Sequence, residues 1–150
     1  MNNPTKYIFY TISINLVIAF LIFISIIGFD IANSVKVILD LKLNFFVGIS
    51  GLFIIGYFLG NKLNKVLKNK GSLKIVHGII SILLILLFGT LIGSTVGYLE
   101  EGLPSYLKYG DLQKTLFDYY FKPLFWIMFF GFIPTLISGV FLGYFLIKLK

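Results

Sequence analysis

The segment 75–98, IVHGIISILLILLFGTLIGSTVGY, decides the fold of this chain. A membrane-spanning helix needs about 20 consecutive apolar residues, because each residue rises about 1.5 Å and the hydrocarbon core is about 30 Å thick. The segment meets that length, and its single ionisable side chain, His77, lies close to one end. Its apolar residues cover every face, whereas a soluble helix buries one apolar stripe. The segment therefore predicts a transmembrane helix.

Three other runs have the same character. Residues 7–29 and 123–147 are uncharged, and residues 44–60 form a shorter run. An N-terminal apolar run can be a signal peptide, but 7–29 exceeds the roughly 7–15 apolar residues of such a signal, so we interpret it as a retained helix. The chain is thus predicted to be an all-α integral membrane protein, a four-helix transmembrane bundle that forms a single domain over residues 1–150.

The composition points to a lipid bilayer as the main partner. Hydrophobic residues make up 58% of the 150 residues, and the mean hydropathy is +0.96. Soluble chains contain about 45–50% apolar residues. Charged residues are only 13%, about half of the usual share of roughly 25%. A soluble domain of this length could not bury so much apolar surface in its own core.

The lysines predict the orientation. Lys6, Lys148, Lys150 and the lysines of segment 61–74 fall on one side of a four-span topology, and all six acidic residues fall on the other. The positive-inside rule places the lysine-rich side, with both termini, in the cytoplasm. The abundance of Lys, Ile, Phe and Asn is typical of an AT-rich bacterial genome. We therefore expect a multi-pass protein of a bacterial cell membrane.

Segment 61–74 is predicted to be a basic cytoplasmic loop. Its five basic residues are Lys62, Lys65, Lys68, Lys70 and Lys74. Such a loop is ordinarily a topology signal. The alternative is binding to anionic lipid or to an acidic partner. No nucleic-acid partner is expected, because the segment has no Arg, no aromatic residue and no element that reads a groove.

Small residues recur at four-residue spacing in the predicted spans. The series are Gly56 and Gly60, then Gly89, Gly93 and Gly97, and finally Gly131, Thr135, Gly139 and Gly143. Residues four apart lie on nearly the same helix face. Small side chains on that face let two helix backbones approach closely in lipid. Packing inside the bundle is the favoured interpretation, with contact between copies of the chain and a glycine-lined pore as alternatives.

Two further residues stand out inside the spans. Pro134 lies in the middle of the fourth span, where a proline removes a backbone donor and usually kinks the helix. The kink is either static or the hinge of a gate. Asn15 lies well inside the first span, where an amide needs a hydrogen-bond partner. A bond to another helix is the favoured interpretation, and a substrate contact is the alternative.

The second and fourth spans resemble each other. Residues 49–59 read ISGLFIIGYFL and residues 137–146 read ISGVFLGYFL, so one deletion aligns ISG and GYFL in both. Both helices would cross the membrane in the same direction, as in the parallel repeats of some transporters. A duplication of a two-helix unit is therefore a hypothesis, with chance similarity of apolar segments as its alternative.

The segments on the other side are predicted to form short interfacial helices. Segment 30–43 carries apolar residues at helical spacing, and Asp111 is placed to be the N-cap of a helix in the loop 99–122. The second loop is rich in Tyr, which collects at bilayer interfaces. Anchoring at the headgroup level is the favoured interpretation. A docking surface for an extracellular partner is the alternative.

The chain lacks the residues that most catalytic and metal sites need. It has no Cys and one His, so a zinc site with about four Cys and His ligands is excluded. His77 is predicted on the side without acids, so a Ser-His-acid triad would have to cross the membrane. No phosphate-binding or dinucleotide motif occurs. We expect no enzyme, no cofactor and no catalytic residue.

The functional expectation follows from this lack of chemistry. A binding, accessory or immunity-type subunit of a membrane complex needs packing surfaces and no reactive groups. Its partner would be another membrane protein, or a further copy of the chain in a homo-oligomer. A small oligomeric permease or channel is the alternative, supported by the glycine series and Pro134.

Overall fold

The structure, a computed structural model, describes residues 3–40 and 42–149, and every regular element in these ranges is a helix. Four helices are long and apolar enough to cross a membrane, which confirms the prediction of four spans. The long helices are α1 (Pro4–Ile26), α3 (Lys42–Lys70), α4 (Ile75–Gly97) and α7 (Lys122–Ile147). The short ones are α2 (Ile31–Asp40), α5 (Leu103–Tyr109), α6 (Leu112–Leu116), and the π-helical turns η1 (Tyr98–Gly102) and η2 (Phe117–Phe121).

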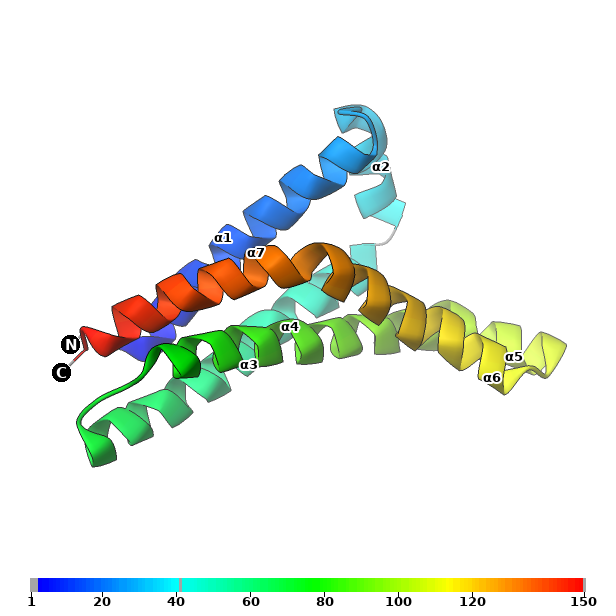
Figure 1. Cartoon of the computed structure of the whole chain (residues 1–150). Coiled ribbons are helices and arrows are strands. Elements are labelled where there is room, and N and C mark those ends of the chain that lie inside the picture. The colour runs from blue at the N-terminus through cyan, green and yellow to red at the C-terminus, as the bar shows by residue number, and fades with distance from the viewer. Residues whose placement is uncertain (1–2, 41, 150) are drawn as a thin grey trace.

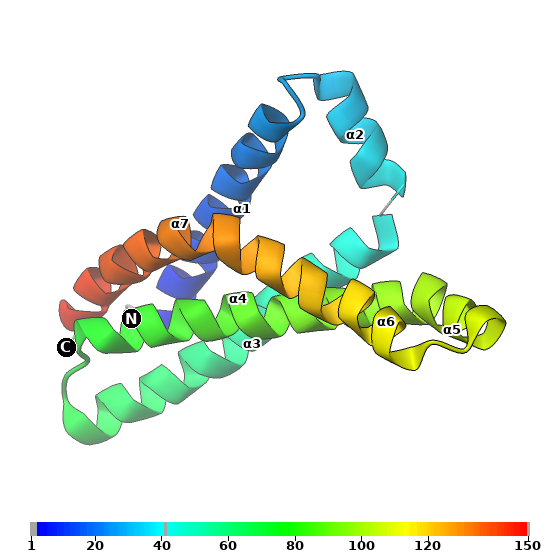
Figure 2. The same cartoon turned by 45° about the vertical axis from the view of Figure 1, so that its right-hand side comes forward.

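The long helices converge at one end of the molecule. Figure 1 shows three features at one end of the molecule: the start of α1, the turn between α3 and α4, and the end of α7. We call this the basal end. Helix α2 and the tip between α5 and α6 lie at the opposite, distal end. Helix α4 packs against both α3 and α7, and α1 packs against α3 and α7. Figure 2 shows that α1 and α3 diverge toward the distal end, where α2 connects them.

Helix α1 starts and ends at clear local signals. The side chain of Asn3 accepts a hydrogen bond of 3.0 Å from the Thr5 backbone N–H, and Pro4 follows at the first helical position. After the helix ends, Gly28 and Phe29 both adopt positive φ angles, of 75° and 64°. A left-handed residue is a common helix terminator. The helix therefore occupies 4–26 instead of the predicted span 7–29.

Helix α3 is longer than the predicted span 44–60. Lysine favours helix, and no glycine or proline interrupts the chain between 61 and 70. Leu63 is buried and fixes this extension to the core. The helix ends where Gly71 takes a φ of 69° and its N–H bonds to the Leu67 carbonyl at 2.8 Å. The prediction of a loop over 61–74 was therefore wrong as far as Lys70.

The predicted loop 99–122 is also mostly helical. One continuous helical stretch covers Ile75–Tyr109, with 35 residues, and another covers Leu112–Ile147, with 36. The turn between them consists of Gly110, with a φ of 75°, and Asp111. The Asp111 side chain accepts a hydrogen bond of 2.9 Å from the Lys114 N–H, which confirms the predicted N-cap. We call residues 98–121 the outer hairpin.

The buried core joins all four long helices in the basal half. Ile8 and Ile12 of α1 meet Ile82 and Ile85 of α4, and Leu142 of α7 lies in the same cluster. Outside this core, large apolar side chains on every long helix are exposed. An aqueous protein rarely shows so much apolar surface, whereas lipid contact requires it.

Candidate functional site

The glycines of α4 and α7 bring those two helices into backbone contact. A Cβ added to Gly78 would lie 2.5 Å from the Cα of Gly143. One added to Gly139 would lie 2.9 Å from the Cα of Ile79, and one added to Gly143 would lie 2.7 Å from the Cα of Ile75. Such distances leave no room for a side chain, so the basal halves of α4 and α7 depend on glycine for their close packing.

The other glycine series face neighbours in the same chain. An added Cβ at Gly60 would lie 2.7 Å from the Thr5 Cα of α1. The glycines of the α4 series face α3, where the residues opposite Gly89, Gly93 and Gly97 are Leu52, Gly48 and Asn44. Gly56 faces Ile8 and Ile12 of α1. A Cβ added to Gly131 would lie 3.7 Å or more from Leu86, so this glycine is not closely packed. These faces are already covered within one molecule, which favours internal packing over contact between copies or a glycine-lined pore.

Asn15 has its partners inside the protein. Its Nδ2 donates to the Ser138 Oγ of α7 at 2.8 Å and to the Thr11 carbonyl at 3.1 Å. The Ser138 hydroxyl lies 3.0 Å from the Thr135 carbonyl, to which it can donate. Asn15 therefore makes the bond between helices that its position in the span favoured.

A lateral groove opens where α1 leaves α7. Its volume is about 300 Å³, and its walls include Ile22 and Phe23 of α1 and Trp126 and Ile127 of α7. Pro134 also lines it. Figures 1 and 2 show α7 bent in its middle, and Pro134 lies inside that helix. The bend and the divergence of α1 thus leave an apolar space that opens toward the surrounding lipid.

Each leg of the outer hairpin contains a π-helical turn. In η1 the Leu103 N–H bonds to the Tyr98 carbonyl, and in η2 the Lys122 N–H bonds to the Phe117 carbonyl. Pro104 and Pro123 follow these turns. A proline inside a helix lacks an N–H and clashes with the carbonyl four residues before it. The wider π turn accommodates each proline without ending the helix.

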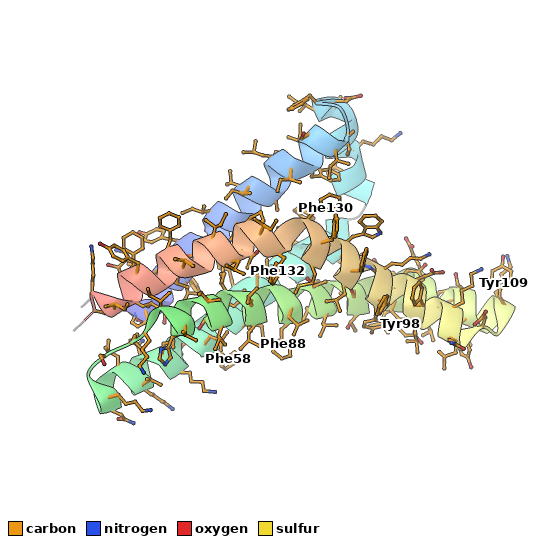
Figure 3. The ribbon with its side chains drawn as sticks, viewed as in Figure 1. Phe58, Phe88, Tyr98, Tyr109, Phe130 and Phe132 are labelled. Carbon is orange, nitrogen blue, oxygen red and sulfur yellow. The ribbon has the colours of Figure 1, made fainter. Side chains whose placement is uncertain are left out.

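The two π turns lie against each other. A Cβ added to Gly102 would lie 2.9 Å from ring carbons of both Tyr98 and Tyr119. The rings of Tyr98 and Tyr120 have centroids 5.7 Å apart, and the Tyr120 hydroxyl donates to the Thr95 Oγ1 at 3.3 Å. Figure 3 shows Tyr98 where the hairpin leaves the bundle. The sequence did not predict this cluster. The signal in the sequence is the two prolines, each of which lies within a stretch that otherwise favours helix.

The distal part of the outer hairpin extends past the other helices. Gly97 lies beside Asn44, close to the start of α3, so the leg from Tyr98 to Tyr109 continues about 18 Å beyond that level. Figure 3 shows Tyr109 at the tip. Leu107 and Tyr109 are 75% and 72% exposed. Further exposed large side chains of the hairpin are Leu99, Leu112, Leu116, Phe117 and Phe121.

The described parts of the chain hold no cluster of metal-ligating side chains. Within residues 3–40 and 42–149, no group of three His, Cys, Asp or Glu side chains is placed to hold a metal ion. His77 Nδ1 accepts a hydrogen bond of 2.9 Å from the Lys74 N–H, so this histidine caps the start of α4.

No family model, curated protein or solved structure matches this chain. Its function is therefore inferred from its own residues.

Proposed function

We propose that this chain is a non-catalytic accessory or immunity-type subunit that binds another protein through its outer hairpin, in a bacterial cell membrane. The observation that carries the proposal is the projection of the hairpin. Its tip displays Leu107 and Tyr109, which are among the most exposed large side chains of the protein. They lie beyond the level at which α3 starts, so contact of a membrane-spanning segment with lipid does not explain why these two side chains are apolar and exposed.

Exposed apolar side chains at that position favour a protein partner. Burying a Leu or Phe side chain contributes about 1.5–3 kcal/mol relative to leaving it in water. Aromatic residues are the usual anchors of protein interfaces, and exposed apolar patches mark binding sites. The paired π turns reinforce this argument, because such turns occur frequently at functional sites. The aromatic cluster around Gly102 holds the two legs together and keeps the tip in a defined orientation.

The proposed orientation places the basal end in the cytoplasm. Lys62, Lys65, Lys68 and Lys70 of α3, the start of α1 and the end of α7 belong to that side, and the acids belong to the distal side. The positive-inside rule then directs the outer hairpin away from the cytoplasm. Helix α2 would lie along the outer interface, where its amphipathic sequence fits the boundary between lipid and water.

Site-specific photocrosslinking in native membranes tests this function. A photoreactive amino acid is placed at Leu107 or Tyr109, and a matched control is placed at Ile133, which is 66% exposed on the apolar part of α7. We expect one dominant protein adduct from the tip positions and mainly lipid adducts from Ile133. Mass spectrometry then identifies the partner.

Two outcomes would contradict the proposal. Lipid adducts at both tip positions would show that the hairpin only anchors the protein at the interface. Adducts between two copies of the chain would show self-assembly through the hairpin instead of a foreign partner.

A small permease is the second candidate, because the Pro134 bend lies beside the groove between α1 and α7. The packing at the level of Asn15 weakens this alternative. The space there among the four long helices is only about 30 Å³, enough for a water molecule or two. Flux of an ion or small solute into liposomes that contain only this protein would favour the permease, provided that Pro134→Ala changes the rate.

A further inference from the structure

The lysine-rich part of α3 forms one wall of a groove at the basal end. The groove has a volume of about 570 Å³. Phe58 lines it, and so do Lys62, Lys65 and Lys68, which follow one another at three-residue spacing along the helix. Residues three and four apart share a helix face, so these lysines and Phe58 form a single stripe. Its basic end lies nearer the end of α3, and its apolar end, Phe58, lies nearer the middle of the helix.

Asn3, the N-cap of α1, lies on the other side of the groove. The Asn64 Nδ2 donates to the Asn3 Oδ1 at 2.6 Å. This bond fixes the start of α1 against α3. The positive end of the α1 dipole therefore adds to the field of the lysines, and both favour an anion. No acidic residue occurs between the start of the chain and Asp30, or between 41 and 99, so nothing from these segments opposes that field.

In the membrane orientation proposed above, on which this inference rests, the groove lies at the depth of the lipid headgroups. Gly60 packs beside Thr5, so residues 60–64 of α3 are level with the first turn of α1. From Lys62 to Lys68 the helix rises about 9 Å. The headgroup layer adds about 5–8 Å on each side of the hydrocarbon core. The groove lysines therefore extend through the headgroup layer, and Phe58, one turn before Lys62, lies at the edge of the hydrocarbon.

We propose that this basal groove binds the headgroup of an anionic phospholipid from the leaflet that surrounds it. The phosphate lies among Lys62, Lys65 and Lys68, and the amide of Asn61 lines the same space. Phe58 contacts the start of the acyl chains. A membrane lipid fits this combination better than a soluble anion does, because Phe58 adds an apolar contact next to the lysines, on the side toward the hydrocarbon of the bilayer.

Lys70 separates such a site from a diffuse basic surface. It belongs to the same helix but lies about 140° around the axis from Lys65, and it does not line the groove. Lys74, at the start of α4, and Lys148, at the end of α7, also lie at the basal end and do not line the groove. These three residues therefore provide a control with the same change in net charge.

The test uses the full-length protein in vesicles of phosphatidylcholine with a minor fraction of phosphatidylglycerol, followed by native mass spectrometry of retained lipid. The groove variant is K62Q/K65Q/K68Q, and the control variant is K70Q/K74Q/K148Q. We expect the affinity for phosphatidylglycerol to fall by about fivefold for each groove lysine removed, because these three lysines are the ones adjacent to the bound phosphate and each contributes about that much. The control variant should lose markedly less.

Phe58→Ala gives a second, uncharged readout. It should weaken retention of phosphatidylglycerol while leaving the net charge unchanged. Equal losses in the groove and control variants would overturn the proposal in favour of diffuse attraction. Displacement of the lipid by added inorganic phosphate would also overturn it, because the groove would then be a site for a soluble anion. Neither result bears on the partner of the outer hairpin.

Discussion

The two helical pairs of this protein, α1 with α3 and α4 with α7, begin alike and end differently. Both pairs are held at the basal end by glycine, with Gly60 against Thr5 in the first and Gly143 against Ile75 in the second. Toward the distal end α4 and α7 stay together as far as the outer hairpin, whereas α1 and α3 separate and α2 connects them. The position of small residues along each helix explains the difference.

Helix α3 changes partner along its length. Its basal glycines, Gly56 and Gly60, face α1, but its distal glycines, Gly48 and Gly51, face α4. Close contact in lipid depends on small residues, so α3 follows α4 where they face it. Helix α1 has no glycine before Gly28 with which to follow α3. The α1–α3 pair therefore opens toward the distal end, whereas the α4–α7 pair stays closed.

The hypothesis of a duplication gains support at one position and loses it at another. The alignment of ISG and GYFL equates Gly56 with Gly143 and Gly51 with Gly139. Gly56 and Gly143 each face the preceding helix of their own pair. Gly139 also faces α4 of its own pair, whereas Gly51 faces Ile92 in the other pair. The two pairs are therefore only partly equivalent in their packing.

The largest expected effect is at the contact between α4 and α7. Gly143→Ala places a Cβ against the Ile75 backbone, which cannot move without separating the helices. Overpacking costs about 1–3 kcal/mol, and backbone contact puts this case near the upper value of about 3 kcal/mol. Gly131→Ala is the matched control on the same helix, since its Cβ would meet only Leu86 at 3.7 Å or more.

The measurement is the free energy of unfolding in mixed micelles with increasing SDS. Gly131→Ala should be neutral or up to about 1 kcal/mol more stable, because Ala favours helix over Gly. Equal stability of the two variants would mean that α4 and α7 do not pack as closely as the structure shows.

The contact between α1 and α3 should be the second most sensitive. In Gly60→Ala the new Cβ would lie 2.7 Å from the Thr5 Cα. We expect a cost of about 1–2 kcal/mol, below that of Gly143→Ala, because α1 is free of α3 over its distal half and can shift. Gly93→Ala, whose Cβ would be 3.5 Å from the Gly48 Cα, is the control. A larger loss for Gly93→Ala in the same unfolding assay would reverse this comparison.

Sequence reasoning found the spans because length and apolarity alone define them. It misplaced their ends, because lipid thickness does not stop a helix. Local propensity carries α3 on through the lysines, and only Gly71 ends it. It also treated Gly102 and Pro104 as part of a loop, whereas π turns keep both inside a helix. Four-residue spacing found most packing glycines but missed Gly78, which stands outside any series and yet contacts Gly143.

The sequence also did not predict which neighbour each residue faces. Asn15 was expected to bond to some helix, and its pairing with Ser138 depends on how α1 crosses α7. Such a crossing is set by many contacts together. Residue spacing within a single helix does not contain it.

The bond between Asn15 and Ser138 should contribute a smaller amount. It joins α1 to α7 at the lateral groove, which Asn15 lines. Hydrogen bonds between membrane helices average about 0.6 kcal/mol and reach about 1.7 kcal/mol. A double-mutant cycle with Asn15→Ala and Ser138→Ala should give a coupling free energy in that range. Additive losses within experimental error would show that Asn15 stabilises the protein through other contacts.

The smallest effect is expected where the outer hairpin keeps α4 and α7 in register. Tyr120→Phe removes the hydroxyl that donates to Thr95 at 3.3 Å, a long bond for an O–H donor, so its loss should cost less than about 0.6 kcal/mol. The ring against Tyr98 remains in this variant, whereas Tyr120→Ala removes that as well. If packing of the rings holds the hairpin, Tyr120→Phe should unfold like the wild type and still crosslink the partner from Leu107. Tyr120→Ala should then lose the crosslink under conditions in which the spans are still folded. Loss of the ring separates the two legs of the hairpin at the π turns and leaves the rest of α4 and α7 packed. Loss of the crosslink in Tyr120→Phe alone would mean that the hydroxyl, and not the ring, orients the tip.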